Sequence, residues 1–327
     1  MRSAGSNRKR GIDMATSQPD WLRRVVLVGT KKGGAGKSSV TAAVGAEAAA
    51  AGRRVLLIDG DPQGNLTQRD LGLEGDGGEG LTNTLLHGTP LQPVTTGREN
   101  LEIIAGGPHT SRAAAIDPDL PPEQTMTREQ ASAMRENFAA ALSALCAERR
   151  YHLVMIDTGP GDHLLMRTWL RAARYLIVPS PADSGSIDGI EMMSELFADA
   201  AKYGSVTRLL GVVLFAPGSR AGTRAVDETL AELTSMVGEQ AGPFRSVIPN
   251  VKIAAEDGSA LGVTPREMVE AITERNRSVI AALRSKLTPD DDTRRLRTKD
   301  PSKLITAYAD LTCEIFERIA AHEKAGA

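Results

Sequence analysis

The sequence predicts an α/β protein built on a single doubly wound, mostly parallel β-sheet that is flanked by helices. Short aliphatic runs alternate with longer helical patterns along most of the 327 residues, as in stacked βαβ units. These runs lack polar and apolar alternation, as strands buried on both faces do. The chain is 41% apolar but only 3% aromatic, so aliphatic side chains must fill most of the core.

Seven strands and six helices are expected, in alternation. The predicted strands are 25–29, 55–58, 101–105, 153–156, 175–178, 210–215 and 245–248. The predicted helices are 37–51, 128–149, 185–203, 223–237, 265–287 and 301–324. Segments 71–80 and 106–124 are rich in Gly or in Pro and Ala, which predicts loops. Helices between parallel strands would be right-handed crossovers that cover the sheet.

Composition limits the classes of function. The formal net charge of -2 means that any nucleic-acid binding requires a local basic surface. Cys146 and Cys313 form neither a metal motif nor a disulfide framework, which suits a reducing cytosol. No apolar run reaches the roughly 18 residues that span a bilayer, so we expect a soluble, cytoplasmic protein. Residues 1–23 are predicted to be a disordered basic tail, and residues 24–327 one domain.

A phosphate-binding loop follows the first predicted strand, and a strongly helical segment follows the loop. Its glycines let backbone N–H groups converge on phosphates, and the helix N-terminus adds positive charge. Lys37 should contact the β and γ phosphates, and Ser38 should bind magnesium through its hydroxyl. The motif therefore predicts a nucleoside triphosphate with Mg²⁺ as the ligand, the alternative being a Gly-rich turn. The predicted nucleotide-binding residues of this loop are Lys32, Gly33, Gly34, Ala35, Gly36, Lys37, Ser38 and Ser39.

The first position of the ordinary pattern G-x-x-x-x-G-K-[ST] is occupied by Lys31 instead of glycine, and Lys32 follows it. This K-G-G-x-G-K-[ST] form resembles the deviant Walker A motif of the ParA and MinD superfamily of P-loop NTPases. The resemblance implies that Lys32 reaches across a dimer interface to the partner's nucleotide. Dimerisation would then depend on ATP. The alternative for Lys32 alone is a solvated lysine.

Acidic residues end two of the predicted strands, where parallel sheets bind ligands. The segment from Asp59 to Asn65 resembles the family's D-x-D-P-Q-G-N motif. By this resemblance Asp61 positions or activates the attacking water, and Asp59 supports the loop near magnesium. Asp157 looks like a Walker B aspartate that holds magnesium through water. Lys32, Lys37 and Asp61 are thus the predicted catalytic residues, and Ser38, Asp59 and Asp157 the predicted metal site. Thr158-Gly159-Pro160 departs from the Cys-Pro-Pro common in the family.

Later segments carry further predictions. Residues 247–252 resemble the family's V-I-P-R-N-V-R without its first arginine, which assigns Pro249 and Asn250 to nucleotide binding. Residues 265–299 are longer than the turn usual there and are predicted to be a surface insertion. The DNA-binding candidates are Arg245, Lys252, Arg266 and Arg284, with Arg275, Arg277, Lys286 and the basic cluster at 294–299. Each of these is alternatively a solvated side chain.

The resemblance implies a slow, partner-stimulated ATPase that converts ATP and water to ADP and phosphate. It would form a homodimer in the ATP state, bind double-stranded DNA non-specifically on the nucleoid, and drive plasmid or chromosome partition with a ParB-like centromere-binding protein. One alternative is a MinD-like membrane-associated positioning ATPase, but residues 320–327 lack the basic amphipathic character that this needs. Another is an ATP-dependent biosynthetic ligase that shares the loop.

Overall fold

The computed structural model describes most of the chain. The described residues are 24–30, 32–114, 127–160, 163–182, 201, 205–217, 222–238, 241–250, 252–284, 297–298 and 300–325. The predicted tail at 1–23, nearly all of the predicted helix at 185–203 and most of the basic cluster at 294–299 lie outside these ranges.

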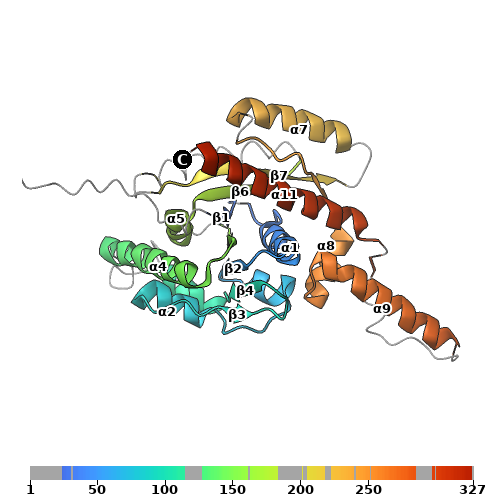
Figure 1. The fold of residues 1–327 in the computed structure, drawn as a ribbon, viewed down its shortest axis with the longest axis horizontal. Coiled ribbons are helices and arrows are strands. Elements are labelled where there is room, and N and C mark those ends of the chain that lie inside the picture. Colours follow the sequence, from blue (N-terminus) through green and yellow to red (C-terminus); the bar gives the residue numbers. More distant parts are fainter. Residues whose placement is uncertain are drawn as a thin grey trace, which may run out of the picture.

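One twisted sheet forms the centre of the molecule (Figure 1). In the described residues its strand order is β3-β4-β2-β5-β1-β6-β7-β8, and every neighbouring pair is parallel except β3 with β4. The chain runs from β1 past β5 to β2, and later from β5 past β1 to β6, so the sheet is doubly wound as predicted. The strands are β1 (Val25–Val28), β2 (Val55–Gly60), β3 (Val94–Thr95), β4 (Leu101–Ile104), β5 (Leu153–Thr158), β6 (Tyr175–Pro181), β7 (Arg208–Pro217) and β8 (Ile248–Asn250).

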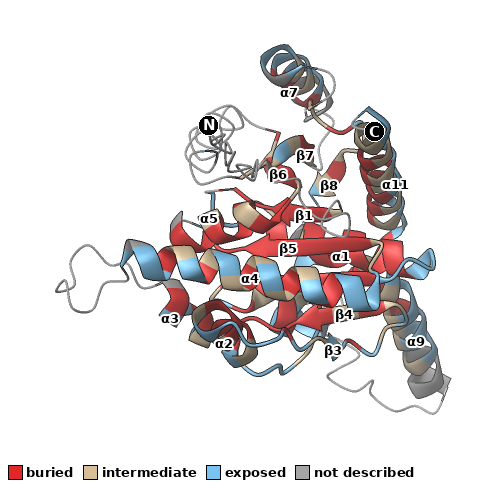
Figure 2. Ribbon diagram, turned by 60° about the vertical axis from the view of Figure 1, so that its left-hand side comes forward, coloured by how far each residue is buried: buried red, intermediate tan, exposed pale blue. Residues whose placement is uncertain are grey.

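Helices cover both faces of the sheet. In chain order they are α1 (Lys37–Ala50), the π-helical turn η2 (Leu66–Asp70), α2 (Glu79–His87), the 3-10 turn η3 (Pro108–Thr110), α3 (Ser111–Ala114), α4 (Arg128–Arg149), α5 (His163–Ala172), α7 (Gly222–Val237), α8 (Lys252–Leu261), α9 (Pro265–Arg284) and α11 (Ser302–Ala325). One core lies between the sheet and α2, α4 and α5, and the other between the sheet and α1, α9 and α11. The central strands are therefore buried on both faces, as Figure 2 shows.

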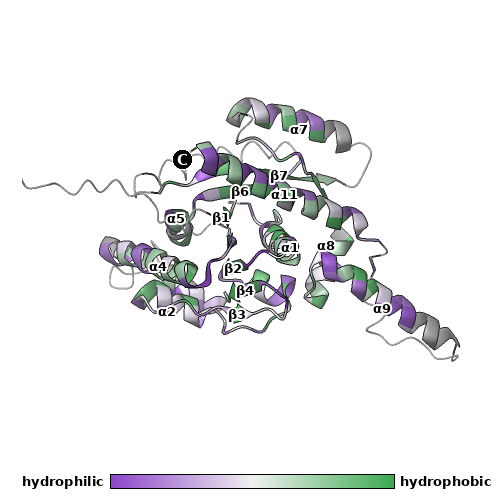
Figure 3. Cartoon of the chain, viewed as in Figure 1, coloured by the Kyte–Doolittle hydropathy of each residue, from purple (hydrophilic) through white to green (hydrophobic). Residues whose placement is uncertain are grey.

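The apolar faces of the helices point at the sheet (Figure 3). Along α11 the residues Leu304, Tyr308, Leu311, Ile315 and Ile319 repeat at helical spacing, and all five are buried. This confirms the prediction of a helix packed on the sheet. None of the helices in the described residues has the length and apolar character needed to cross a bilayer.

Some elements were not predicted. The predicted loop at 71–80 runs into α2, and the predicted loop at 106–124 contains η3 and α3. The helices α5 and α8 were missed because each has only ten residues and charged or Gly positions interrupt its apolar pattern. The last strand begins at Ile248 instead of 245, because the backbone N–H groups of Arg245 and Ser246 donate to Glu314 of α11 and not to β7.

The predicted surface insertion at 265–299 begins with α9. The first turns of α9 are part of the core, since Met268 and Ile272 are buried against α1 and α11. Val269 on the same helix is exposed. The start of the segment therefore helps to close the sheet face that carries α1.

Candidate nucleotide site

The phosphate loop and the predicted carboxylates meet at the carboxyl edge of three neighbouring strands. Val28, the last residue of β1, is in register with Asp157 on β5, and Asp157 is in register with Asp59 on β2. The loop between β1 and α1 therefore lies directly beside both acidic strand ends. Register in the parallel sheet places these groups together although they are far apart in the sequence.

The glycine turn has the backbone geometry that a phosphate cradle requires. Gly34 and Gly36 have φ values of 67° and 83°, a left-handed conformation that glycine adopts without strain. A Cβ atom on Gly36 would lie 2.5 Å from Cζ of Phe215, so this position also has no room for a side chain. Above Gly33 and Gly34, by contrast, a Cβ would meet no atom within 4 Å. This open space lies at the N-terminus of α1, where an anion is stabilised.

Lys37 is turned inward across the loop. Its side chain is only 6% exposed, and its ammonium donates a hydrogen bond to the backbone carbonyl of Lys32 at 3.2 Å. Burial lowers the Lys37 pKa, and the nearby Asp157 and Asp61 carboxylates oppose that change. Lys32 itself is exposed at the mouth of the loop. Lys31 lies outside the described residues.

Asp157 is a fully buried carboxylate that fits a cation site. Within the described part of the chain, neither of its oxygens accepts a hydrogen bond of ordinary geometry. Burial and the neighbouring Asp59 raise its pKa well above the usual range, while the Ser38 hydroxyl and Lys37 oppose the rise. A buried carboxylate without partners is costly unless a cation neutralises it.

The described residues contain no group of three or more Asp, Glu, His or Cys side chains placed to hold a metal ion. Mg²⁺ keeps several waters and is usually bound by one or two protein groups together with substrate phosphates, so the Ser38 hydroxyl and the Asp157 carboxylate are enough to hold it. Ser38 and Asp157 are therefore the residues that would hold it.

Asp59 holds the loop that follows β2. Its Oδ2 accepts hydrogen bonds from the backbone N–H of Thr67 at 2.8 Å and from the Thr67 hydroxyl at 2.7 Å. Its Oδ1 accepts one from the backbone N–H of Asp61 at 3.3 Å. Burial raises the pKa of Asp59 to about 6, and the bonds from Thr67 limit the rise. Its oxygens are thus engaged within the protein, and its role near magnesium stays a prediction.

Asp61 lies between the loop that follows β2 and the loop that follows β5. Its side chain is 5% exposed, and Oδ1 accepts a hydrogen bond from the backbone N–H of Gln63 at 2.9 Å. A Cβ atom on Gly159 would lie 2.8 Å from the same oxygen, so only glycine leaves room for the carboxylate. The neighbouring Thr158 hydroxyl donates to the carbonyl of Val28 at 3.1 Å. The segment Thr158-Gly159 therefore contacts both the end of β1, just before the phosphate loop, and Asp61.

Two adjoining cavities extend from the loop. The first, of about 250 Å³, is mainly apolar, and its lining includes Phe215, Pro249, Asn250, Met268 and Tyr308 beside the loop glycines. The second, of about 330 Å³, is lined by residues that include Lys37, Ser38, Asp61 and Pro160. The structure thus places Pro249 and Asn250 in one cavity with the loop glycines, and their role in nucleotide binding stays a prediction. The apolar lining of the first cavity could take a base, and the charged and hydroxyl groups that line the second could take phosphates.

Sequence reasoning missed three residues of this site. Phe215 packs against Gly36, and its position at the carboxyl end of β7 is a signal that could have identified it. Thr67 and Asp70 belong to η2, a turn without a sequence signature. Asp70 lines both cavities, and burial raises its pKa to about 7.

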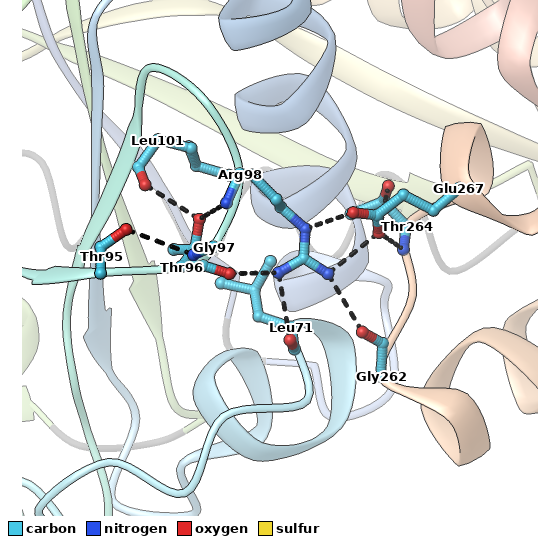
Figure 4. A network of polar contacts seen from close by, with 9 residues as sticks. All are labelled: Leu71, Thr95, Thr96, Gly97, Arg98, Leu101, Gly262, Thr264 and Glu267. Carbon is cyan, nitrogen blue, oxygen red and sulfur yellow. Dashed lines mark hydrogen bonds and ion pairs between the residues drawn. The ribbon is translucent and has the colours of Figure 1, made fainter.

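The helix α8 forms one wall of the cavities, and Arg98 attaches its end to the rest of the domain (Figure 4). The Arg98 guanidinium makes two hydrogen bonds to Glu267 of α9, at 2.6 and 2.9 Å. It also donates to the carbonyls of Gly262, after α8, and of Leu71, after η2, each at 3.1 Å. One side chain therefore joins the α8–α9 junction to the segment that leaves the Asp61 loop.

Two of the DNA-binding candidates that the structure describes, Arg245 and Arg266, are paired with acidic side chains. Arg266 makes a bidentate ion pair with the buried Glu47 of α1. Arg245 pairs with Glu317 at 3.1 Å and lies 3.6 Å from Glu314. The backbones of Lys252 and Arg284 begin α8 and end α9, and their side chains lie outside what the structure describes.

Comparison with known proteins agrees with this geometry. Residues 23–206 match the family described as AAA domain. The chromosome-partitioning ATPase Soj of Thermus thermophilus is 30% identical over 71% of this chain and 84% of its own. The sporulation initiation inhibitor protein Soj of Bacillus subtilis is 27% identical over 71% of this chain and 87% of its own. A solved structure of cobyrinic acid a,c-diamide synthase from Mycobacterium smegmatis, with bound ATP analogue and magnesium, has a TM-score of 0.62 at 20% identity. It covers 93% of this chain and 96% of its own, a likeness of fold alone.

Proposed function

The chain belongs to the ParA/Soj-type partition ATPases of the ParA/MinD family, and we propose that it is an ATP-dependent dimerising switch that binds DNA without sequence preference and drives plasmid or chromosome partition. The observation that carries the proposal is the loop itself. Lys37 is buried among the carboxylates, while Lys32 is exposed at the mouth of the same loop. We propose that Lys37 contacts the protomer's own nucleotide and that Lys32 contacts the nucleotide of a partner.

ATP with Mg²⁺ is the proposed ligand. The loop N–H groups and Lys37 would bind the phosphates, and the cavity beside Pro249, Asn250 and Phe215 would take the adenine. When bound, Mg²⁺ neutralises phosphate charge and would be held by Ser38 and Asp157. The unpartnered Asp157 carboxylate supports this assignment.

Hydrolysis would use the second cavity, where Asp61 faces the space beside Lys37 and Ser38. We propose that Asp61 orients the water that attacks the γ phosphate, so that ATP and water give ADP and phosphate. Catalysis would come mainly from positioning and charge neutralisation. The early Lys32 would add positive charge from the partner protomer, and a slow basal rate would follow when no partner is bound.

The switch would work through the contact between the loops after Asp59 and Asp157. Asp61 on one loop is packed against Gly159 on the other, so a ligand that moves either loop moves both. A γ phosphate that orders these loops would favour the dimer, and its release would favour monomers. A ParB-like centromere-binding protein is the proposed stimulating partner, with the ATP dimer bound to the nucleoid in the cytoplasm.

The test is co-sedimentation with random-sequence double-stranded DNA in ATP and in ADP. We expect the protein to pellet with DNA in ATP more than in ADP, and Lys37→Ala to lose the ATP effect because it cannot bind the phosphates. Binding to anionic vesicles in ATP, without any ATP effect on DNA binding, would instead support a membrane-associated positioning ATPase. Equal DNA binding in ATP and ADP would contradict the proposal.

A further inference from the structure

Two polar residues lie where the two cavities of the nucleotide site meet. Apart from residues 34–39 at the phosphate loop, the described residues that line both cavities are Asp70, the last residue of η2, and Ser259 on α8. The two elements that carry them contact each other. The boundary between the cavities therefore contains a carboxylate and a hydroxyl beside the loop glycines.

Neither side chain has a hydrogen-bond partner among the described residues. The Asp70 carboxylate and the Ser259 hydroxyl are both half-buried, and they make no hydrogen bond or ion pair with any residue that the structure describes. A partly buried carboxylate without a donor is unfavourable. Beside a phosphate site it is also repelled by the ligand. The position of Asp70 is therefore explained if the ligand brings hydrogen-bond donors to it.

The ends of the two elements are fixed to each other. Gly72, just after η2, and Gly262, just after α8, are packed backbone against backbone, because a Cβ atom on Gly72 would lie 3.1 Å from Cα of Gly262. Arg98 donates to the carbonyl of Gly262 at 3.1 Å and to the carbonyl that precedes Gly72 at the same distance (Figure 4). The fold therefore sets the spacing of Asp70 and Ser259 before any ligand binds, as selective recognition requires.

We propose that Asp70 and Ser259 bind the ribose of the nucleotide and make the site selective for ribonucleotides over deoxyribonucleotides. The sugar joins the base to the phosphates, so a base in the first cavity and phosphates in the second place the sugar at the boundary. Its 2′ and 3′ hydroxyls are donors, and the two oxygens of one carboxylate can accept from both. Carboxylates recognise ribose hydroxyls in other nucleotide-binding α/β folds. The inference rests on the proposed function, which supplies the nucleotide.

The test is isothermal titration calorimetry of the full chain with ADP, 2′-deoxy-ADP and 2′,3′-dideoxy-ADP in the presence of Mg²⁺. Diphosphates keep hydrolysis and the proposed ATP-dependent pairing out of the measurement. The site variants are Asp70→Ala and Ser259→Ala. The matched control is Glu74→Ala, because Glu74 is exposed, lies close to Asp70 in the chain and lines neither cavity. Thermal unfolding reports whether each variant is folded.

We expect the wild type to bind 2′-deoxy-ADP at least about tenfold more weakly than ADP, because the missing hydroxyl leaves a polar group of the site unpaired. Binding of 2′,3′-dideoxy-ADP should be weaker still. In Asp70→Ala the affinities for ADP and the deoxynucleotides should agree within about twofold. Ser259→Ala should lose part of the preference, and Glu74→Ala should keep all of it.

The ratio of affinities separates ribose recognition from other effects of the substitution. All three ligands carry the same phosphates, so a change in charge repulsion cancels in the ratio, and a loss of structure weakens all three equally. Equal affinity of the wild type for ADP and 2′-deoxy-ADP would overturn the proposal and leave the proposed function intact. An unchanged ratio in Asp70→Ala would overturn it too.

A contact of Asp70 with the base is the competing explanation. Inosine diphosphate lacks the amino group of adenine and keeps the ribose. The proposal would be overturned if Asp70→Ala lost the preference for ADP over inosine diphosphate but kept the preference for ADP over the deoxynucleotides. Failure of the wild type to bind any of these diphosphates would contradict the proposed function itself, and this inference with it.

Discussion

At the scale of single residues, we propose the Asp61 carboxylate as the group that orients the attacking water. It lies at the cavity that also contains Lys37 and Ser38. We expect Asp61→Ala to bind ATP but hydrolyse it at least about 100-fold more slowly, because a positioned base contributes a factor of this order. Phosphate release measures the rate of hydrolysis. Light scattering in ATP should show a persistent dimer. Asp61→Asn, which keeps the hydrogen bond to Gln63, controls for the shape of the loop. Wild-type hydrolysis by Asp61→Ala would contradict the role.

Asp70 gives a second prediction at this scale, on pH. Its pKa is raised to about 7, so it ionises as the pH rises through neutrality. The negative form lines both cavities and repels the triphosphate. Between pH 6 and pH 8, ATP affinity should therefore fall about fivefold more in the wild type than in Asp70→Asn. This difference corresponds to about 1 kcal/mol of binding free energy. Titration with a fluorescent ATP analogue measures the difference. Identical pH profiles would show that Asp70 does not face the nucleotide.

At the scale of elements, the junction of α8 and α9 depends on Arg98. Its side chain is 17% exposed and that of Glu267 is 31% exposed. Loss of Arg98 leaves the Glu267 carboxylate with only its hydrogen bonds from Thr264 and leaves two backbone carbonyls without their donor. We expect Arg98→Ala to lower the free energy of unfolding by about 2 kcal/mol and to weaken ATP binding through α8. Thermal unfolding and ATP titration measure both effects. The exposed Arg112→Ala is the control, and equal stability of the two variants would count against this contact.

The elements also show how far the sequence could predict the site. Each predicted segment of the site follows an apolar strand, and strand ends meet at one edge of a parallel sheet. The sequence could therefore predict the loop from Lys32 to Ser39 and the carboxylates Asp59, Asp61 and Asp157. Thr67 and Asp70 were missed because the turn η2 that carries them has no sequence signature, and Phe215 was missed because it reaches the loop from a strand far along the chain. The start of β8 was misplaced for the same reason, since Glu314 takes the preceding N–H groups. The local sequence pattern carries no information about such contacts.

At the scale of the whole molecule, we propose that Lys32 decides whether two protomers form one switch. Its side chain is exposed, while the atom that Lys37 contacts is its backbone carbonyl. The affinity of Lys32→Ala for ATP should therefore stay within about a few fold of the wild-type affinity. The ATP-dependent dimer should weaken at least about 30-fold, because a charge-assisted bond to the partner's phosphate is lost in each half.

Light scattering with a non-hydrolysable ATP analogue measures the dimer, and a fluorescent analogue measures binding. Lys303→Ala, an exposed lysine on α11, is the matched control for loss of one positive charge. A Lys32→Ala protein that dimerises like this control would mean that the exposed lysine is only a solvated side chain. Hydrolysis would then have to be sensed within one protomer, through the contact of Asp61 with Gly159.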